Sequence, residues 1–455
     1  MLNIASGTAG VFCDSIPRRS FLQIGSLGMG GLALPELLRA EASAGSSSSS
    51  HKAVIMVFLP GGPPHLDMYD PKPDAPSTVR GEFDPISTNV PGIQVSELMP
   101  RQAEIMDKLA IVRSVVGTAD EHSAFHCLTG WASKGFQPAG GWPSLGAVVS
   151  KVQGSTQPGV PPFVGLAREM NTRALSDSGA PGFLGLAHGP FKVNKGGVHA
   201  DMVLHGITTR RLDDRRTLLK RFDRFRRGVD ASGTLDSLDA FQRQALGILT
   251  SNRLLEALDL SREDPAVRER YGKAGGYYRF RPDVTEKPGG AGALEDFLVA
   301  RRLVEAGVRC VTLNFGKWDW HEFNFRQAKS NVPRLDQGVT ALVQDLHERG
   351  LHKDVTVVIW GEFGRTPRIN KLSGRDHWPQ VMSVVLAGGG LRTGQVVGAT
   401  NRLGERSIEE PVQFQRVFAT LYHQLGIRPE RLCMNDRDGR PHYLLNHHEP
   451  IRQLL

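Results

Sequence analysis

The sequence contains little cysteine, and its cysteines are not arranged in pairs. Cys13, Cys127, Cys310 and Cys433 are the four cysteines among 455 residues, and no Cys-x-x-Cys motif occurs. Cys13 lies in a segment that we expect to be removed, which leaves an odd number with wide spacing. This pattern excludes a disulfide framework and a structural zinc knuckle built on cysteine.

Long apolar runs and blocks of like charge are also missing. No run in the chain reaches the roughly 20 apolar residues that a membrane span needs. The formal net charge is +8, but the basic residues are spread along the chain, which is typical of a solvated basic surface. We therefore expect no transmembrane span in the mature chain and no nucleic-acid partner.

The first 44 residues have the features of an export signal. Arg18-Arg19 stands directly before Ser-Phe-Leu, an apolar and glycine-rich run covers 24–38, and small-residue cleavage sites lie within 40–44. These features predict a twin-arginine signal peptide over 1–44 and a flexible linker over 45–52. The mature protein is then expected in the periplasm or outside the cell. The alternative is a chance arginine pair before an amphipathic helix.

Short apolar runs that alternate with helical patterns predict an α/β fold. We expect a central, mostly parallel sheet with helices on both faces, in a domain over 53–455 with a loop-rich insertion around 154–292. The expected strands cover 53–59, 109–116, 308–315, 355–360 and 381–387. The main expected helices cover 99–108, 212–228, 236–258, 294–306, 334–349 and 411–425.

The stretch from Thr356 to Pro379 carries the clearest functional signal. Its apolar strand breaks into Gly-Glu-Phe-Gly-Arg-Thr-Pro, and Asp376-His377 follow before the next apolar run. Ligands of open α/β sheets bind at the carboxyl ends of strands. Glu362, Asp376 and His377 are therefore candidate metal ligands. Arg365 is a candidate for neutralising an anion or, alternatively, for an ion pair within the loop.

The same order of apolar strand, glycine turn and polar cluster recurs in two other places. His65, Asp67 and Asp70 follow the first strand, and Asp319 and His321 follow a later one. Asp70 precedes a proline and fits a turn. The others are candidate ligands.

Another polar segment follows strand 109–116. The spacing of His122 and His126 predicts that both lie on one helix face, where they would suit a shared ion. Ser123 would then lie at the helix N-terminus, where free N–H groups favour anions and a hydroxyl nucleophile is often held. The alternative is that His122 and Ser123 are helix caps.

Together these clusters predict a metal site. Mixed carboxylate and imidazole ligands suit Zn, Mn or Fe, and suit Ca or Mg less well as the number of histidines rises. Each residue alone would be ordinary, so the hypothesis rests on their repeated position after apolar strands.

With these motifs the chain resembles an exported family known as domain of unknown function 1501. Matching segments cover nearly the whole mature chain and include GGPPHLDMYDPKPDAP, RSVVGTADEHSAFHCLTG, WDWHEFNF, GEFGRTPRIN and GRDHWP. The family is considered similar to the alkaline phosphatase and sulfatase superfamily, whose members hydrolyse or transfer phosphate and sulfate esters on a metal site. The resemblance implies an alkaline-phosphatase-like fold.

The resemblance also implies residue roles. Asp67 resembles the first-strand metal aspartate and Ser123 the nucleophile, whereas His377 resembles the late metal histidine. Asp319 and His321 resemble the acid and imidazole pair of one metal position. Glu362-Phe363-Gly364 resembles the Asp-His-Gly ligand turn, with Phe363 in place of a histidine. No Cys or Ser of the mature chain lies in the Cys/Ser-x-Pro-x-Arg motif from which sulfatases make formylglycine.

The expected function is that of an exported, metal-dependent hydrolase of phosphate or sulfate esters. Its substrate would be an anionic small-molecule or polysaccharide ester, and its cofactor a divalent metal (Zn, Mn or Ca). One alternative, which Phe363 favours, is a non-catalytic binding protein on a degenerate alkaline-phosphatase-like scaffold. Another is a metal-dependent enzyme of different chemistry.

The export signal gives a first test. Replacing both Arg18 and Arg19 with lysine should leave the precursor in the cytoplasm, because the arginine pair is the feature that the export machinery reads. Cell fractionation and N-terminal sequencing of the exported protein, which should start near residue 43 or 45, would check this. Unchanged secretion of the double variant would contradict the assignment.

Overall fold

The computed structural model describes residues 51–455, except 169, 171–172, 194–246, 248–251 and 273–292. Contacts along the chain separate two units, 1–50 and 51–455, and all described residues belong to the second. The expected signal peptide therefore lies outside the described residues. So do the helix expected over 212–228, most of the linker and most of the helix expected over 236–258.

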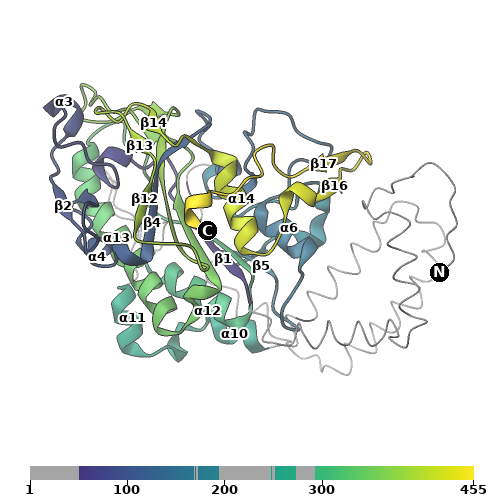
Figure 1. The fold of residues 1–455 in the computed structure, drawn as a ribbon. Coiled ribbons are helices and arrows are strands. Elements are labelled where there is room, and N and C mark those ends of the chain that lie inside the picture. Colours follow the sequence, from purple (N-terminus) through teal and green to yellow (C-terminus); the bar gives the residue numbers. More distant parts are fainter. Residues whose placement is uncertain (1–50, 169, 171–172, 194–246, 248–251, 273–292) are drawn as a thin grey trace, which may run out of the picture. The chain divides into compact units, whose positions relative to one another are not determined.

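A nine-stranded sheet forms the centre of the fold (Figure 1). Its order is β12-β4-β11-β8-β1-β7-β5-β6, and β15 pairs with β4 beyond β12. Only β11 is antiparallel to its neighbours, which are β8 and β4. The strands are β1 (Ala53–Phe58), β4 (Leu109–Val116), β5 (Phe163–Gly165), β6 (Phe191–Lys192), β7 (Cys310–Asn314), β8 (Val355–Trp360), β11 (Met382–Gly388), β12 (Gln395–Val397) and β15 (Val412–Gln413).

Four two-stranded ribbons complete the β-structure of the described residues. They pair β2 (Pro85–Ser87) with β3 (Gln94–Ser96), β9 (Gly364–Arg365) with β10 (His377–Trp378), β13 (Ala399–Thr400) with β14 (Ser407–Glu409), and β16 (Cys433–Asn435) with β17 (Pro441–Tyr443). The β9–β10 ribbon closes the long loop after β8 and sets His377 opposite Arg365.

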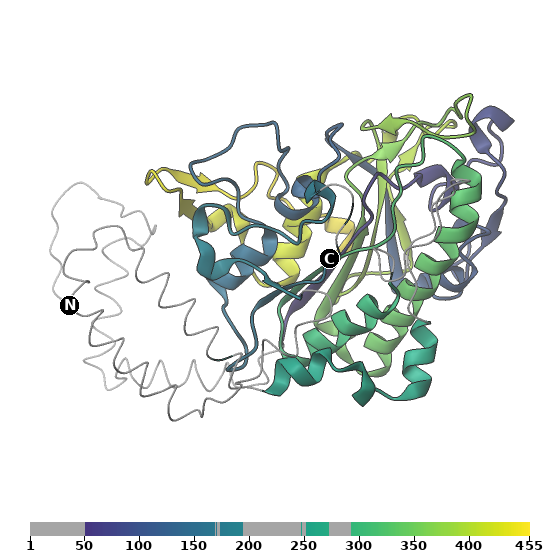
Figure 2. The same ribbon diagram turned by 180° about the vertical axis from the view of Figure 1, so that it is seen from behind.

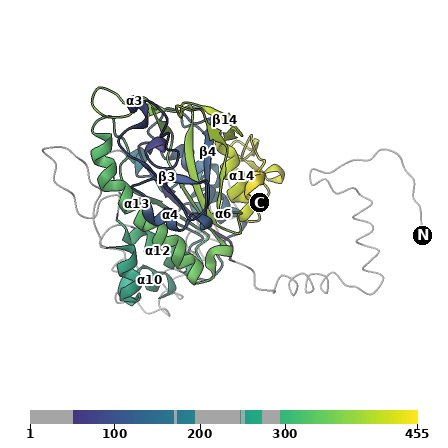
Figure 3. The same cartoon turned by 60° about the vertical axis from the view of Figure 1, so that its left-hand side comes forward.

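Helices cover both faces of the sheet (Figures 1 and 3). Side chains alternate along β1, so that Ile55 and Val57 pack into one apolar core and Val54 and Met56 into the other. The first core contains α4 (Pro100–Glu104), α10 (Asn252–Leu258), α11 (Pro265–Tyr271), α12 (Glu295–Ala306) and α13 (Asn324–Glu348), and the second contains α5 (Phe125–Thr129), α6 (Leu145–Val152) and α14 (Phe414–Gln424). A further short helix, α3 (Ser77–Arg80), follows β1.

Single 3-10 turns connect several of these elements. They cover His65–Asp67, Met106–Lys108, Arg173–Leu175, Gly182–Leu184, Leu186–His188, Leu260–Arg262, Leu351–Lys353, Pro429–Arg431 and Arg452–Leu454. No helix in the described part of the chain is long and apolar enough to span a membrane.

The predicted sheet is confirmed. The five expected strands are β4, β11, β8, β1 and β7, and they are consecutive neighbours in one mostly parallel sheet. They are recognisable in the sequence because strands covered on both faces are apolar throughout. Since β1, β4, β7 and β8 run in the same direction, the loops that follow them meet at one edge of the sheet.

The expected start of the helix at 334 is wrong. Helix α13 has 25 residues, begins at Asn324 and passes through Pro333 (green in Figure 2). A proline usually limits a helix, which is why the sequence pattern suggested a later start. Burial of Phe325, Ala328 and Val332 stabilises the additional turns.

Candidate metal centre

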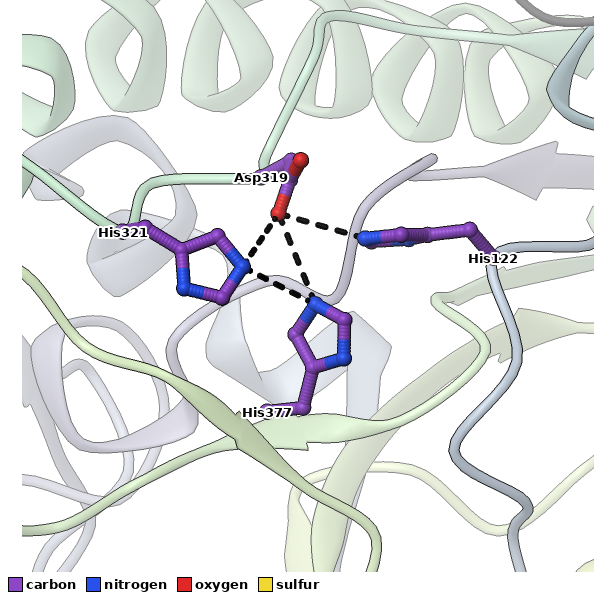
Figure 4. Close-up of side chains that lie close together, drawn as sticks. All are labelled: His122, Asp319, His321 and His377. Atoms are coloured by element: carbon purple, nitrogen blue, oxygen red, sulfur yellow. Dashed lines mark hydrogen bonds and ion pairs between the residues drawn. The ribbon is translucent and has the colours of Figure 1, made fainter.

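Four side chains meet at the carboxyl edge of the sheet, namely His122, Asp319, His321 and His377 (Figure 4), and we call them the four-residue group. One ligand atom from each lies within 4.8 Å of all the others. The Nε2 atoms of His122, His321 and His377 are 3.3, 3.0 and 3.6 Å from Oδ1 of Asp319. The Nε2 atoms of His321 and His377 are 3.0 Å apart.

These separations have the size that a bound metal ion requires. Zn bonds of about 2.1 Å to nitrogen and oxygen place the atoms of a tetrahedral ligand set about 3.4 Å apart. The contacts to Asp319 in the four-residue group, from 3.0 to 3.6 Å, lie on both sides of this value. The group therefore needs little rearrangement to hold one ion.

Each imidazole of the four-residue group also contacts a carboxylate through its Nδ1 atom. Nδ1 of His321 is 2.6 Å from Asp376 and Nδ1 of His377 is 2.5 Å from Asp120. Nδ1 of His122 is 3.3 Å from Glu362. An ionised carboxylate only accepts, so each ring donates its Nδ1–H.

This tautomer leaves a lone pair on Nε2 of each neutral ring. The Nε2 atoms of His321 and His377 then face each other and an oxygen of Asp319, so acceptors converge. Such a convergence is stabilised by a proton or by a metal ion. Histidines that donate their other N–H to a carboxylate are typical metal ligands, because the carboxylate fixes the tautomer and raises ligand basicity.

Two glycines hold the carboxylate behind His122. The N–H groups of Gly61 and Gly62 donate to Glu362 at 2.8 and 3.2 Å. Both glycines have positive φ, and a Cβ on them would lie 2.4 Å from the backbone of Asp319 and 2.6 Å from the ring of Phe363. The glycine turn after β1 therefore lets Glu362 bind backbone amides directly beside the four-residue group.

Arg365 is a structural cation of the centre. It is fully buried and donates to the carbonyl oxygens of Gly61, Gly62 and Arg375, and to Asp319 at 2.8 Å. Arg365 thus pairs with an aspartate of the loop after β7, and not with a carboxylate of its own loop as the sequence allowed.

The charges of the centre shift two pKa values. Hydrogen bonds to Asp319 and then to Glu362 raise the pKa of His122 to about 9, against the effect of burial. Burial alone would raise the pKa of Asp319, but contacts with His122, His377 and Arg365 hold it far below its usual range. At neutral pH a proton on His122 offsets part of the negative charge, a role that a divalent ion would take over.

The four-residue group is open to solvent. All four residues are half-buried, and the side chain of His321 is 43% exposed. Structural zinc sites are closed by protein ligands, whereas catalytic sites keep a position for water or substrate. The exposure of the four-residue group therefore favours a catalytic site over a structural one.

Asp67 lies elsewhere, in a buried ion pair. Both of its oxygens accept from Arg375 at 2.8 Å, and one also accepts from Asn324. His65, which is buried as well, contacts the carbonyl of Gly404 through Nε2. Asp67 is not part of the four-residue group, and Arg375 and Asn324 occupy three of the roughly four acceptor sites of its carboxylate. Asp70 pairs with Lys72 and accepts from Thr400.

The expected helix over 122–126 is wrong, because α5 begins at Phe125. His122 therefore lies before the helix, and His126 is buried with its ring centroid 4.1 Å from that of Phe414. The hydroxyl of Ser123 accepts the N–H of Phe125, but Ala124 is the N-cap residue of α5 and no side chain caps this helix, so the capping alternative is not confirmed either. His122 and His126 do not share one face, and Ser123 is not at the N-terminus of an extended helix.

Sequence reasoning missed two features of the centre. Asp120, which holds His377, was not a candidate, although it lies two residues before His122. Phe363 packs against the rings of His377 and His122, with centroids 4.5 and 5.3 Å away. It supports the imidazoles at the position where the superfamily resemblance suggested a ligand.

The fold and the centre define an α/β protein with a candidate three-histidine, one-aspartate metal centre. The chain belongs to the family described as Protein of unknown function (DUF1501), which matches residues 51–455. No curated protein sequence matches the chain.

Solved structures with some likeness include three enzymes. They are the PsFucS1 sulfatase from Pseudoalteromonas sp. (10% identity, 86% of this chain and 70% of that chain, TM-score 0.34), the phosphonate monoester hydrolase SpPMH from Silicibacter pomeroyi (10%, 82% and 73%, 0.36), and the lipoteichoic acid synthase LtaP from Listeria monocytogenes (8%, 88% and 88%, 0.32). Because these TM-scores are low, their residues and reactions are not transferred to this chain.

The different surroundings of Asp67 and Asp319 give a paired test. Asp67→Ala should lower the free energy of unfolding by about 3–5 kcal/mol, because Arg375 stays buried without its carboxylate, and should weaken zinc binding far less than Asp319→Ala does. Asp319→Ala should abolish zinc binding at a smaller cost in stability. Urea denaturation and zinc titration of both variants check this. Loss of zinc binding with intact stability in Asp67→Ala would place Asp67 among the ligands.

His126 predicts a pH dependence of stability. Burial lowers its pKa to about 4, below the value of about 6.5 in an unfolded chain. The native state therefore binds this proton less well, and stability present above pH 6.5 is lost as the pH falls towards 4, by roughly 3 kcal/mol. His126→Leu should flatten the curve of unfolding free energy between these pH values, whereas the exposed His423→Gln should not. Equal pH dependence in wild type and His126→Leu would contradict the assignment.

Proposed function

We propose that the chain is a metal-dependent hydrolase of phosphate or sulfate esters that acts outside the cytoplasm. One observation carries the proposal, namely that three Nε2 atoms converge on Asp319 while each Nδ1 atom donates to a carboxylate. The ester class comes from the resemblance of the motifs to a family considered similar to alkaline phosphatases and sulfatases. The twin-arginine signal expected over residues 1–44 supports the location, because that export route carries already folded proteins.

The ligand types favour a transition metal. Three imidazoles and one carboxylate suit Zn, Mn or Fe, whereas Ca prefers six to eight oxygen ligands. Among the expected ions, Zn and Mn therefore fit the centre better than Ca. The carboxylates of Asp120, Asp376 and Glu362 add negative charge around the ion, which favours the divalent form.

A divalent ion in this position would polarise an ester oxygen and lower the pKa of a bound water. Asp319 and the carboxylates behind the rings would hold the ligands in one orientation before substrate arrives. We assign the nucleophile to water rather than to Ser123, because the hydroxyl of Ser123 contacts the N–H of Phe125 and has no basic side chain of the described residues within hydrogen-bond distance. The half-exposed His321 marks the side from which substrate would approach.

The second candidate is a non-catalytic binding protein on the same scaffold. Arg365 favours it, since this guanidinium is buried and used by backbone carbonyls and Asp319, and is not free to neutralise an ester anion. The hydrolase requires the metal, whereas a binding protein on a degenerate scaffold does not.

The metal itself is tested first. Protein purified without chelator should contain close to one equivalent of transition metal, and removal of the metal should lower Tm, because an ion bound only to the native state stabilises it. His377→Ala should lose the metal. Asp120→Asn should weaken zinc affinity by about 10–100-fold, because it supports a ligand. His188→Ala, which alters a histidine outside the four-residue group, is the matched control.

Activity then separates the two candidates. The metal-loaded chain should hydrolyse at least one of 4-nitrophenyl phosphate, bis(4-nitrophenyl) phosphate and 4-nitrophenyl sulfate, and His377→Ala should not. Bound metal without turnover on a broad ester panel would support the binding protein instead. Metal content near zero, equal in wild type, His377→Ala and His188→Ala, would refute the metal site and the hydrolase, and would leave the binding protein.

A further inference from the structure

Two exposed apolar side chains lie on the loops that hold the metal centre. Phe323 is 37% exposed and Leu372 is 60% exposed. Phe323 follows His321 by two residues, and Leu372 precedes Asp376 by four. Exposed apolar side chains are common singly, but two on adjoining loops beside a candidate centre form a surface that a ligand can use.

Hydrogen bonds join the two loops directly. The N–H of Phe323 donates to the carbonyl of Leu372 at 3.1 Å, and the N–H of Asn324 donates to that of Ser373 at 2.9 Å. The side chain of Asn370 links these loops to the centre. Its amide N–H₂ donates to the carbonyl of His321 and to Asp376, and its oxygen accepts the N–H of Leu372. The apolar pair is therefore fixed relative to His321.

Backbone strain gathers at the same place. Phe323 and Ser373 have φ of 53° and 54°, and Glu410 is the only other non-glycine residue with positive φ in the described ranges. This conformation is costly for a side chain as large as phenylalanine. Strained residues occur preferentially at ligand sites, where the surrounding structure holds them. A glycine would adopt this backbone conformation at 323 without strain.

We propose that Phe323 and Leu372 form an apolar rim that binds the aryl leaving group of the ester. This rests on the proposed function, which places the anionic group at the four-residue group. The two rim residues lie on the loops that carry His321 and His377, and His321 is the most exposed of the three histidines. An aryl group is favoured over a small alkyl group because a flat ring gains both apolar contact and an aromatic pair with Phe323.

Binding rather than turnover gives the test. The zinc-loaded chain is titrated calorimetrically with phenylphosphonate and methylphosphonate, which share the anionic group and are not hydrolysed. We expect about tenfold tighter binding of phenylphosphonate, from the apolar area of one ring face. The double variant Phe323→Ala/Leu372→Ala should bind both equally, with methylphosphonate affinity unchanged. Leu186→Ala, which removes another exposed leucine, should keep the preference.

A second variant separates binding from folding. Phe323→Gly should lose the preference while its Tm changes little, because relief of backbone strain offsets the apolar contact that the partly buried ring loses. A clear fall in Tm would show that Phe323 is structural. A wild type that binds both phosphonates equally, or neither, overturns the rim, and so does a double variant that keeps the preference. A phenyl preference without ester hydrolysis overturns the proposed function alone.

Discussion

Three carboxylates determine where the imidazoles of the centre point. Asp120, Asp376 and Glu362 each accept the Nδ1–H of one ring, so each Nε2 is directed at Asp319. These carboxylates lie in the loops after β4 and β8, far apart in the sequence but adjacent at the sheet edge. Without the parallel strands the loops would not meet, and without the carboxylates the rings would be free to turn. The metal centre thus depends on hydrogen bonds that only this topology makes available.

The two aspartates expected as ligands illustrate two ways of holding a carboxylate. Arg375 satisfies both oxygens of Asp67, and the pair is buried, which makes it part of the scaffold. Arg365 contacts only one oxygen of Asp319, and three imidazoles converge on the same atom. Asp319 is also accessible to solvent. A cation site requires a carboxylate whose charge is only partly neutralised, other acceptor atoms that converge on it, and access from solvent. Asp319 meets these three conditions, and Asp67 meets none of them.

The sequence predicted the strands and the sheet edge that carries the site. It did not predict which side chains form ion pairs or hydrogen bonds across that edge. Apolar runs identified the sheet because strands buried on both faces tolerate few polar residues. Polar clusters after those strands indicated the edge where Asp319, His321 and His377 meet. The pairing of Asp67 with Arg375 spans 308 positions, and that of Asp120 with His377 spans 257. No local pattern reports such contacts. The prediction of a helix over 122–126 was wrong because a spacing of four residues between two histidines is only a weak sign of a helix.

Asp67 nevertheless contributes to the centre, because it holds the two loops that carry its histidines. It accepts from Asn324, three residues after His321, and from Arg375, two residues before His377. The buried ion pair therefore fixes the start of α13 and the return of the long loop after β8 at the same point. Both loops deliver a histidine, and the same two loops carry Phe323 and Leu372. Asp67 thus acts as a buried anchor, which allows the exposed loops around the centre to hold a defined geometry while they remain open to a ligand.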